Sequence, residues 1–200
     1  MSFTRTVHVI DDDAAVLNST AAFLRAHAFD VKTYSAGRDF LKVVGSHTTG
    51  CVVTDVRMNG MSGLDLAEEL RARQIGLPVI IITAHADISL VIEAMRRGAV
   101  DLLEKPFSSR ALVTSIHDAM AHRNAAGAGI NLEAIRERVQ ALTGREKEVL
   151  SRLLQGSPNK IIARELGIST RTVESHRATI MSKMNASSLA ELVRMSMSAS

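Results

Sequence analysis

Five short apolar strands alternate with helical segments over the first 120 residues of this 200-residue chain. Each strand is an almost continuous run of apolar, mostly β-branched residues, which is typical of strands buried on both faces of a parallel sheet. The pattern predicts an α/β doubly wound, flavodoxin-like fold with right-handed crossovers and the strand order 2-1-3-4-5. The expected strands cover residues 6–10, 31–34, 51–55, 79–82 and 100–103.

The alternation ends near residue 120, after a helix expected over residues 112–120. Glycines among alanines from Asn124 to Gly129 then mark a linker, and a weak helix is expected over residues 131–139. Everything beyond has helical spacing. We therefore predict three parts: a domain over residues 6–120, a linker over 121–136 and a small all-α domain over 137–200.

The second domain has the outline of a helix-turn-helix. Ser157 and Pro158 are expected to be the N-cap and the first residue of a helix that ends at Gly167. Ser169 or Thr170 is expected to cap the longer helix that follows. A short helix, a glycine turn and a longer basic helix are the elements of this motif.

Charge is divided unevenly between the two domains. Residues 1–124 carry 13 basic and 14 acidic side chains, a balance of −1. Residues 137–200 carry 10 basic and 6 acidic side chains, a balance of +4. The excess positive charge favours a polyanion as the partner of the C-terminal domain.

The chain is expected to work in the cytoplasm. Its N-terminus lacks the apolar core of a signal peptide, and no apolar run approaches the roughly 20 residues of a membrane span. Cys51 is the only cysteine, so no intramolecular disulfide is possible, which suits a reducing compartment. Its place in an apolar strand predicts a buried, unreactive thiol.

Acidic side chains stand where neighbouring strands end. Asp11 and Asp12 follow the first strand and Asp55 ends the third, so the strand order brings all three to one edge of the sheet. Three such anions repel one another, and a hard divalent cation that accepts carboxylate oxygens and water, Mg²⁺, relieves the repulsion. Thr83 and Lys105 end the fourth and fifth strands and add a hydroxyl and a positive charge.

A carboxylate nucleophile, a metal ion, a lysine and a hydroxyl together predict a phosphoryl-transfer site centred on Asp55. Each residue alone also has a simpler interpretation. The acidic residues after the first strand can cap a helix, as we expect of Asp13. Thr83 can end a strand, Lys105 can be an exposed surface charge, and Asp55 can accept hydrogen bonds from its own loop. The agreement of four strand ends favours the phosphoryl-transfer site.

Two other chemistries that use the same fold fail on particular residues. A phosphatase of the haloacid dehalogenase type needs a second aspartate two residues after its nucleophile, and that position here is Arg57. A flavodoxin cradles the phosphate of its flavin in a Ser/Thr-rich loop after the first strand. The corresponding loop here is three aspartates, residues 11–13, which would repel phosphate.

At these residues the chain resembles the receiver domain of two-component response regulators, over residues 6–120. With its C-terminal part it is similar to regulators of the FixJ/NarL type, which carry a LuxR-type helix-turn-helix, here over about 137–200. The segment Val100–Phe107 is most similar to the FixJ branch. The resemblance implies a regulator rather than an enzyme, since a receiver promotes only its own phosphorylation and dephosphorylation.

The resemblance also implies a role for each site residue. Asp55 accepts the phosphoryl group from a sensor histidine kinase, Thr83 turns toward that group, and Lys105 bonds it. A cis Lys105–Pro106 peptide bond holds the lysine in position. Mg²⁺ takes four ligands, which are the side chains of Asp11, Asp12 and Asp55 and the backbone carbonyl of Arg57.

Some positions depart from the family pattern or are expected to adjust it. Leu102 stands where an aromatic partner of Thr83 is usual, so rotation of an aromatic ring cannot report phosphorylation here. Asn59 stands where proline is usual, which removes a rigid φ constraint and predicts a more mobile loop. Arg57 and His85 lie two residues beyond Asp55 and Thr83 and are expected to tune the lifetime of the phosphoryl group, unless they are simply exposed loop residues.

The second domain offers candidate contacts to DNA. Lys160, Lys183 and Arg171 are suited to contact phosphates. Glu174 could accept a hydrogen bond from cytosine and Arg177 could donate one to guanine, while His176 recurs at the helical spacing of the core residues. The alternative is a solvated charged helix that binds a protein. The candidate residues are Lys160, Arg171, Thr172, Glu174, Ser175, His176, Arg177, Ala178 and Lys183.

The sequence thus predicts a DNA-binding transcription regulator controlled by phosphorylation of Asp55, which shifts a two-state receiver. By its resemblance to the FixJ branch, the phosphorylated chain is expected to form a homodimer through the face over residues 88–107 and to bind a two-fold DNA site. The expected partners are a histidine kinase, double-stranded DNA and, as a further candidate, RNA polymerase, with no membrane contact. The alternatives are an adaptor or phosphate sink, and a regulator that binds DNA regardless of phosphorylation.

Overall fold

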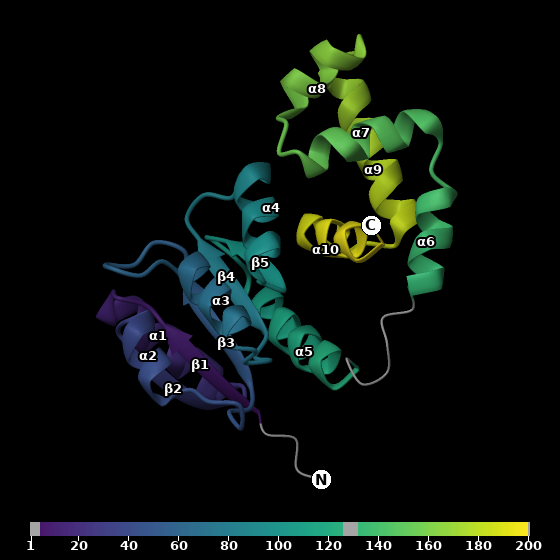
Figure 1. The fold of residues 1–200 in the computed structure, drawn as a ribbon. Helices are drawn as coiled ribbons and strands as arrows, with labels where there is room; N and C mark the ends of the chain where they lie inside the picture. Colours follow the sequence, from purple (N-terminus) through teal and green to yellow (C-terminus); the bar gives the residue numbers. More distant parts are fainter. Residues whose placement is uncertain (1–4, 126–131, 200) are drawn as a thin grey trace. The chain divides into compact units, whose positions relative to one another are not determined.

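The computed structural model describes residues 5–125 and 132–199 of the chain. Contacts between residues divide the chain into two compact units, residues 1–86 with 96–128 and residues 87–95 with 129–200. The first unit contains a β-sheet covered by helices, and the polypeptide from residue 132 onward forms helices (Figure 1).

The first unit is built on five parallel strands in the order β2-β1-β3-β4-β5, as predicted. Val9 of β1 lies opposite Thr33 of β2 on one side and Val53 of β3 on the other. Because β1 and β3 are neighbours, the acidic residues at their ends reach the same edge of the sheet. The strands are β1 (Thr6–Ile10), β2 (Asp30–Tyr34), β3 (Cys51–Asp55), β4 (Val79–Thr83) and β5 (Asp101–Glu104).

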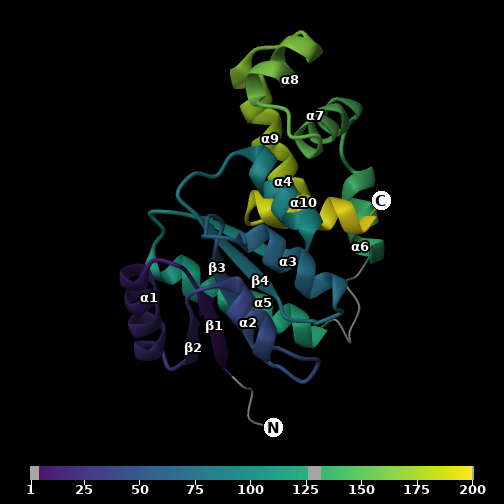
Figure 2. The ribbon, with the colours of Figure 1, turned by 60° about the vertical axis from the view of Figure 1, so that its left-hand side comes forward.

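Four helices connect successive strands, and a fifth, α5, follows the last strand (Figures 1 and 2). Asp13 caps the first of them, since its Oδ1 accepts from the backbone N–H groups of Ala15 and Val16 at 2.8 and 3.2 Å. This confirms the role expected of Asp13. The helices are α1 (Ala14–Ala26), α2 (Gly37–Val43), α3 (Gly63–Ala72), α4 (Ile88–Arg97) and α5 (Ser109–Ala125).

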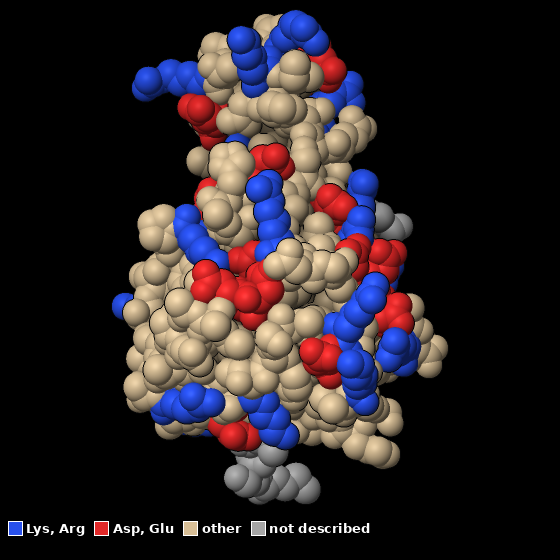
Figure 3. All heavy atoms as spheres, turned by 90° about the vertical axis from the view of Figure 1, so that its left-hand side faces the viewer, with Lys and Arg blue, Asp and Glu red and all other residues tan. Residues whose placement is uncertain are grey.

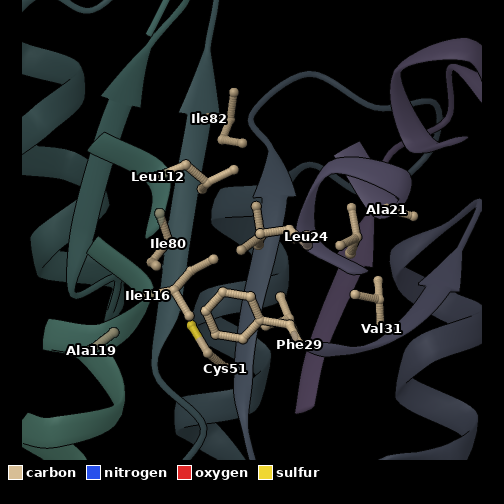
Figure 4. Packing of buried hydrophobic residues seen from close by; sticks show 13 residues of the cluster. Ala21, Leu24, Phe29, Val31, Cys51, Ile80, Ile82, Leu112, Ile116 and Ala119 are labelled. Carbon is tan, nitrogen blue, oxygen red and sulfur yellow. The ribbon is translucent and has the colours of Figure 1, made fainter. Parts of the chain in front are cut away.

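One hydrophobic cluster lies between the sheet and helices α1 and α5 (Figure 4). Leu24 of α1 and Ile116 of α5 are fully buried there against strand residues such as Cys51 and Ile80. Burying side chains of the size of leucine and isoleucine contributes about 1.5–3 kcal/mol each. Burial also raises the pKa of the Cys51 thiol, which keeps it protonated. As expected, this cysteine is a packed apolar side chain.

The helices of the C-terminal part pack around a second hydrophobic core. The fully buried residues of this cluster include Val149, Ile162, Val173, Ile180 and Met184. Val149, Ile162 and Val173 come from three different helices, so this core holds the two helices of the helix-turn-helix against the helix before them. These helices are α6 (Leu132–Gln140), α7 (Gly144–Leu154), α8 (Asn159–Leu166), α9 (Thr170–Met184) and α10 (Leu189–Ala199).

The ends of α8 and α9 agree with prediction except at one cap. Gly167 ends α8 in the left-handed conformation with φ 65°, and Ser169 caps α9 by accepting from the N–H of Thr172 at 3.0 Å. The prediction for Ser157 was wrong, because Pro158 is the N-cap of α8 and no side chain bonds to the cap. Its ring fixes φ near the observed −62°, so the chain enters the helix without a hydroxyl cap.

Other boundaries moved by a few residues. The helix expected over residues 112–120 is α5, which begins at Ser109 and continues to Ala125, so the start of the predicted linker is helical. Residues 126–131, which include the rest of its glycine-containing stretch, lie outside the described residues. The weak helix expected next is α6. Within the described ranges, no helix has both the length and the apolar character that crossing a membrane requires.

Candidate functional site

A pocket of about 260 Å³ lies beside the strand ends of β1, β3 and β5. Asp11, Asp55 and Lys105 supply its charged groups, while Val16 of α1 and Phe107 contribute apolar walls. The pocket stands at the carboxyl edge of a parallel sheet, where open α/β folds bind their ligands. Three residues that the sequence assigned to one site therefore line one cavity.

Asp55 is the best-connected carboxylate of this pocket. Lys105 Nζ donates to its Oδ1 at 2.7 Å, and the backbone N–H of Arg57 donates to its Oδ2 at 2.7 Å. The Asp55 side chain is 15% exposed, so the ion pair is partly shielded from water while Asp55 stays accessible to a small reactant. The backbone N–H of Lys105 donates to the carbonyl of Thr83 at 2.8 Å, and the Lys105–Pro106 peptide bond is cis.

Asp11 is buried beside these groups, with 7% of its surface exposed. Burial raises the pKa of its carboxyl, and the negative charges of Asp55 and Asp12 raise it further. A hydrogen bond from the N–H of Asp13, at 2.9 Å, and the charge of Lys105 oppose this rise in pKa. One lysine therefore does not balance the acidic charge, and the edge of the sheet favours a cation.

Asp12 has a different partner. Its Oδ2 accepts hydrogen bonds from the backbone N–H of Asn59 at 2.8 Å and from Asn59 Nδ2 at 2.6 Å. The sequence analysis treated Asn59 only as the loss of a proline and did not predict this contact. The signal in the sequence was the side-chain amide of Asn59, which can donate to the carboxylates expected at the same edge of the sheet.

The chemistry of these residues fits Mg²⁺. Three carboxylates without histidine or cysteine make a hard oxygen donor set, and a cation would favour the charged form of Asp11, whose pKa is raised first by burial and then by Asp55 and Asp12. Across residues 5–125 and 132–199, however, no three His, Cys, Asp or Glu side chains are grouped as a metal site. Asp11 and Asp55 line the pocket together, whereas Asp12 is not among the lining residues and bonds to Asn59 through Oδ2.

Thr83 is buried at the end of β4, and its hydroxyl is turned to its own loop. Its Oγ1 donates to the carbonyl of His85 at 3.0 Å and accepts from the His85 N–H at 3.2 Å. The His85 side chain is 84% exposed and lies 3.8 Å from a carboxylate oxygen of Glu104, and Arg57 is also exposed. Neither residue is among those that line the pocket, and their expected effect on the lifetime of the phosphoryl group stays a prediction.

The predicted DNA-binding residues lie on or beside α8 and α9. Arg171, Glu174, Ser175 and Ala178 are exposed on α9. Lys160, at the start of α8, is exposed as well. Lys and Arg side chains gather at the α8 end of these helices in Figure 3. Thr172, His176 and Arg177 are half-buried, so His176 is partly packed as its spacing suggested. This surface presents positive charge together with the exposed face of a helix.

Two of these residues also make contacts within the helical part. Lys183 Nζ donates to both carboxylate oxygens of Glu146, at 3.0 and 2.8 Å, and Glu146 Oε2 accepts from the N–H of Thr143 at 2.7 Å. The hydrogen bond from Lys183 is the main cause that lowers the pKa of Glu146. Arg177 Nη1 donates to Asn159 Oδ1 at 3.0 Å and so joins α9 to α8.

Comparisons with known proteins agree with this geometry. Residues 7–117 match the family described as response regulator receiver domain, and residues 140–196 match bacterial regulatory proteins of the luxR family. The transcriptional regulatory protein FixJ of Rhizobium meliloti is 44% identical over 193 residues, which cover 96% of this chain and 95% of that protein.

Other relatives extend over the same length. The C4-dicarboxylate transport transcriptional regulatory protein DctR of Rhodobacter capsulatus is 40% identical and covers 98% of this chain and 100% of its own. A crystal structure of full-length FixJ from B. japonicum is similar with a TM-score of 0.57 and 42% identity, covering 97% and 96% of the two chains. The chain therefore belongs to the two-component response regulators, in which a receiver domain and a LuxR-type helix-turn-helix form a phosphorylation-dependent transcription regulator.

Proposed function

We infer that Asp55 is the phosphoacceptor of this regulator and that its phosphorylation by a histidine kinase controls DNA binding. The observation that carries this assignment is the contact between Asp55 Oδ1 and Lys105 Nζ at 2.7 Å, inside a pocket open to a small reactant. The receiver spans residues 6–120, the linker 121–136 and the DNA-binding domain 137–200.

The residues around Asp55 suit in-line phosphoryl transfer. A carboxylate oxygen of Asp55 forms a bond to phosphorus as the bond between phosphorus and the nitrogen of a phosphohistidine breaks, and the leaving imidazole takes up a proton. Lys105, which bonds to Asp55 before the transfer, then donates to the negatively charged phosphoryl oxygens. The N–H of Arg57, at 2.7 Å from Oδ2, holds the carboxylate in orientation during the attack.

Mg²⁺, held by Asp11, Asp12, Asp55 and the backbone carbonyl of Arg57, would neutralise charge on the phosphoryl oxygens. The buried position of Asp11 keeps its carboxylate fixed toward the pocket, because its Oδ1 is already held by the N–H of Asp13. The exposed side chains of Arg57 and His85, two residues beyond Asp55 and Thr83, tune how long the phosphoryl group survives, since either can alter the approach of water.

Thr83 provides a readout that needs no aromatic partner. Its hydroxyl makes two hydrogen bonds to the backbone of His85, and turning toward a phosphoryl group on Asp55 breaks both. The loop from Ala84 to Asp87, which leads into α4, then loses its link to the end of β4. Leu102, half-buried on β5, has no aromatic ring that could rotate. The backbone of the loop therefore carries the signal of phosphorylation.

The activated chain forms a homodimer through the face over residues 88–107 and presents two α9 helices to a two-fold DNA site. The balance of +4 in residues 137–200 supports DNA as the ligand. Exposed Glu174 and Ser175 occupy the α9 surface from which a recognition helix reads bases, whereas Lys160 and Arg171 are free to reach phosphates. RNA polymerase is a further partner of such an assembly.

The assignment of Asp55 is tested by incubating the full chain with acetyl phosphate and Mg²⁺ and measuring its intact mass. We expect one added phosphoryl group on the wild type, none on Asp55→Asn, and strongly reduced labelling of Lys105→Met. The adduct should be labile to hydroxylamine, as an acyl phosphate is. Equal labelling of Asp55→Asn would rule out this assignment.

A further inference from the structure

Asn59 joins the loop after β3 to the acidic residue that follows β1. Its backbone N–H and its side-chain Nδ2 both donate to Asp12 Oδ2, at 2.8 and 2.6 Å. Both are charge-assisted hydrogen bonds that converge on one carboxylate oxygen. A proline, the residue that most response regulators are expected to have at this position, could supply neither donor.

These two bonds engage Oδ2 of Asp12, an oxygen that a cation at this edge of the sheet would also seek. Asp11 and Asp55 line the pocket together with Lys105, whereas Asp12 is not among the lining residues. In the part of the chain that the structure describes, no three potential ligands are arranged to hold a metal. A cation that takes Asp12 as a ligand through Oδ2 therefore competes with the two Asn59 donors for that oxygen.

We propose that Asn59 is a latch on Asp12 that holds this carboxylate in the metal-free receiver and competes with Mg²⁺ for it. The inference rests on the proposed function, because it assigns Asp12 to the cation. Asn59 is a positioning residue, since it acts through Asp12. Mg²⁺ demands near-ideal octahedral geometry, so a ligand that is bonded elsewhere lowers its affinity for the site.

The latch couples two measurable quantities. If the contacts between Asn59 and Asp12 exist only in the metal-free chain, removing them destabilises that state and leaves the metal-bound state unchanged. The affinity for the cation then rises by the factor that the metal-free state loses in stability. For an ordinary hydrogen bond exposed to solvent, that factor is about two to ten.

The test is calorimetric titration of the full chain with Mg²⁺ alone and, separately, with Mn²⁺ alone. Asn59→Ala removes the side-chain donor, and Asn59→Pro removes the backbone donor as well. Asn18→Ala, at an exposed asparagine of α1, is the matched control. We expect Asn59→Ala to bind either cation about fivefold more tightly, or more, with Asn59→Pro at least as tight and the control unchanged.

Melting temperatures provide a second readout that does not depend on phosphorylation. Asn59→Ala should melt below the wild type without a cation and together with it at saturating Mg²⁺. An unchanged or weaker cation affinity in Asn59→Ala would overturn the latch. If the wild type still binds Mg²⁺ and is phosphorylated on Asp55, that result leaves the proposed function intact. A wild type that binds neither cation would overturn both the latch and the proposed metal site.

Discussion

The charged carboxylate of Asp11 lowers the stability of the fold at the residue that the proposed metal site needs. Its carboxyl is buried near two other acids, and its pKa is raised, first by burial and then by the charges of Asp55 and Asp12. A carboxyl with a raised folded-state pKa destabilises the fold at neutral pH, and this penalty disappears as the pH falls through that pKa. Function and stability therefore oppose each other at this residue.

Asp11→Asn is expected to raise the melting temperature of the metal-free chain at pH 7 by roughly 2–5 °C. The amide removes the buried charge and still accepts from the N–H of Asp13. The gain should shrink as the pH falls and the wild-type carboxyl becomes protonated. Saturating Mg²⁺ should also shrink it, because the wild type gains a ligand for the cation. A variant less stable than the wild type in metal-free buffer at pH 7 would contradict this account.

His8 titrates in the opposite sense. It is 2% exposed, its Nε2 lies 3.1 Å from the carbonyl of Thr49, and its Nδ1 has no partner in the structure. Burial lowers its pKa, so the fold holds it neutral. Stability that is fully present above the unfolded-state pKa, about 6.5, is lost as the pH falls below it. The ring packs beside Tyr34 and Phe40.

His8→Phe should keep this packing and remove the titration. In the wild type, the free energy of unfolding should fall by up to about 1.4 kcal/mol per pH unit below pH 6.5 because of His8. Denaturant unfolding at several pH values should show a flatter profile for His8→Phe than for the wild type. Parallel profiles for His8→Phe and the wild type would exclude this role of His8.

Which site residues the sequence could predict follows from their position. Asp11, Asp55 and Lys105 end strands, so strand order alone brings them to one pocket. The link between Asp12 and Asn59 joins positions 47 residues apart, and it depends on the path of a loop that no periodicity describes. The same reason explains why the direction of the Thr83 hydroxyl was not predicted, since it depends on the turn at His85.

At the scale of elements, the junction between β3 and α3 determines where Asp55 lies. Gly63 begins α3, and its N–H donates to the carbonyl of Val56 at 3.1 Å. A Cβ built on Gly63 would lie 2.3 Å from the carbonyl oxygen of Asp55 and 3.0 Å from Thr54 Cγ2. The helix approaches the strand end so closely that only glycine fits.

Gly63→Ala should therefore displace either α3 or the backbone of Asp55. We expect a loss of about 1–3 kcal/mol in the free energy of unfolding and slower labelling by acetyl phosphate. Gly76→Ala is the matched control, because a Cβ there meets no atom of the described residues within 4 Å. Normal stability and labelling in Gly63→Ala would show that the junction adapts.

The pair between Glu146 and Lys183 joins the start of α7 to the end of α9. Glu146→Gln should reduce the protection of amide groups from hydrogen exchange in both helices. It should also lower the melting temperature of the helical domain by several degrees. Glu148→Gln, on the exposed side of α7, is the control. The pKa of Glu146 is lowered, mainly by the hydrogen bond from Lys183. The stabilisation is therefore present above pH 4.5 and is lost as the pH falls further. Equal protection in the two variants would argue against the pair.

Elements were predictable where the pattern is strong. The strands of the sheet carry unbroken apolar runs, and their order follows from the alternation with helices. Ends were less predictable, because helix caps depend on single residues. Ser157 offered a hydroxyl, yet Pro158 occupies the cap. The length of α5 was underestimated because its last residues have the alanine-rich composition that also marks a linker.

At the scale of the whole molecule, the chain combines an acidic site at the edge of a sheet with a basic helical part. The difference in net charge between residues 1–124 and 137–200 already predicts that the second part binds a polyanion. The communication between the two parts was not predictable in the same way. Leu102 removes the usual aromatic signal, and the contacts of Thr83 with His85 became visible only in three dimensions.

The central claim is that phosphorylation of Asp55 controls the affinity for DNA. The most direct measurement compares binding of one duplex, selected from a random pool by the phosphorylated chain, with and without acetyl phosphate and Mg²⁺ at a fixed salt concentration. The account predicts that phosphorylation tightens binding by the wild type by about tenfold or more, a typical allosteric coupling, and leaves Asp55→Asn unchanged. Equal affinity of the wild type in both conditions would contradict it.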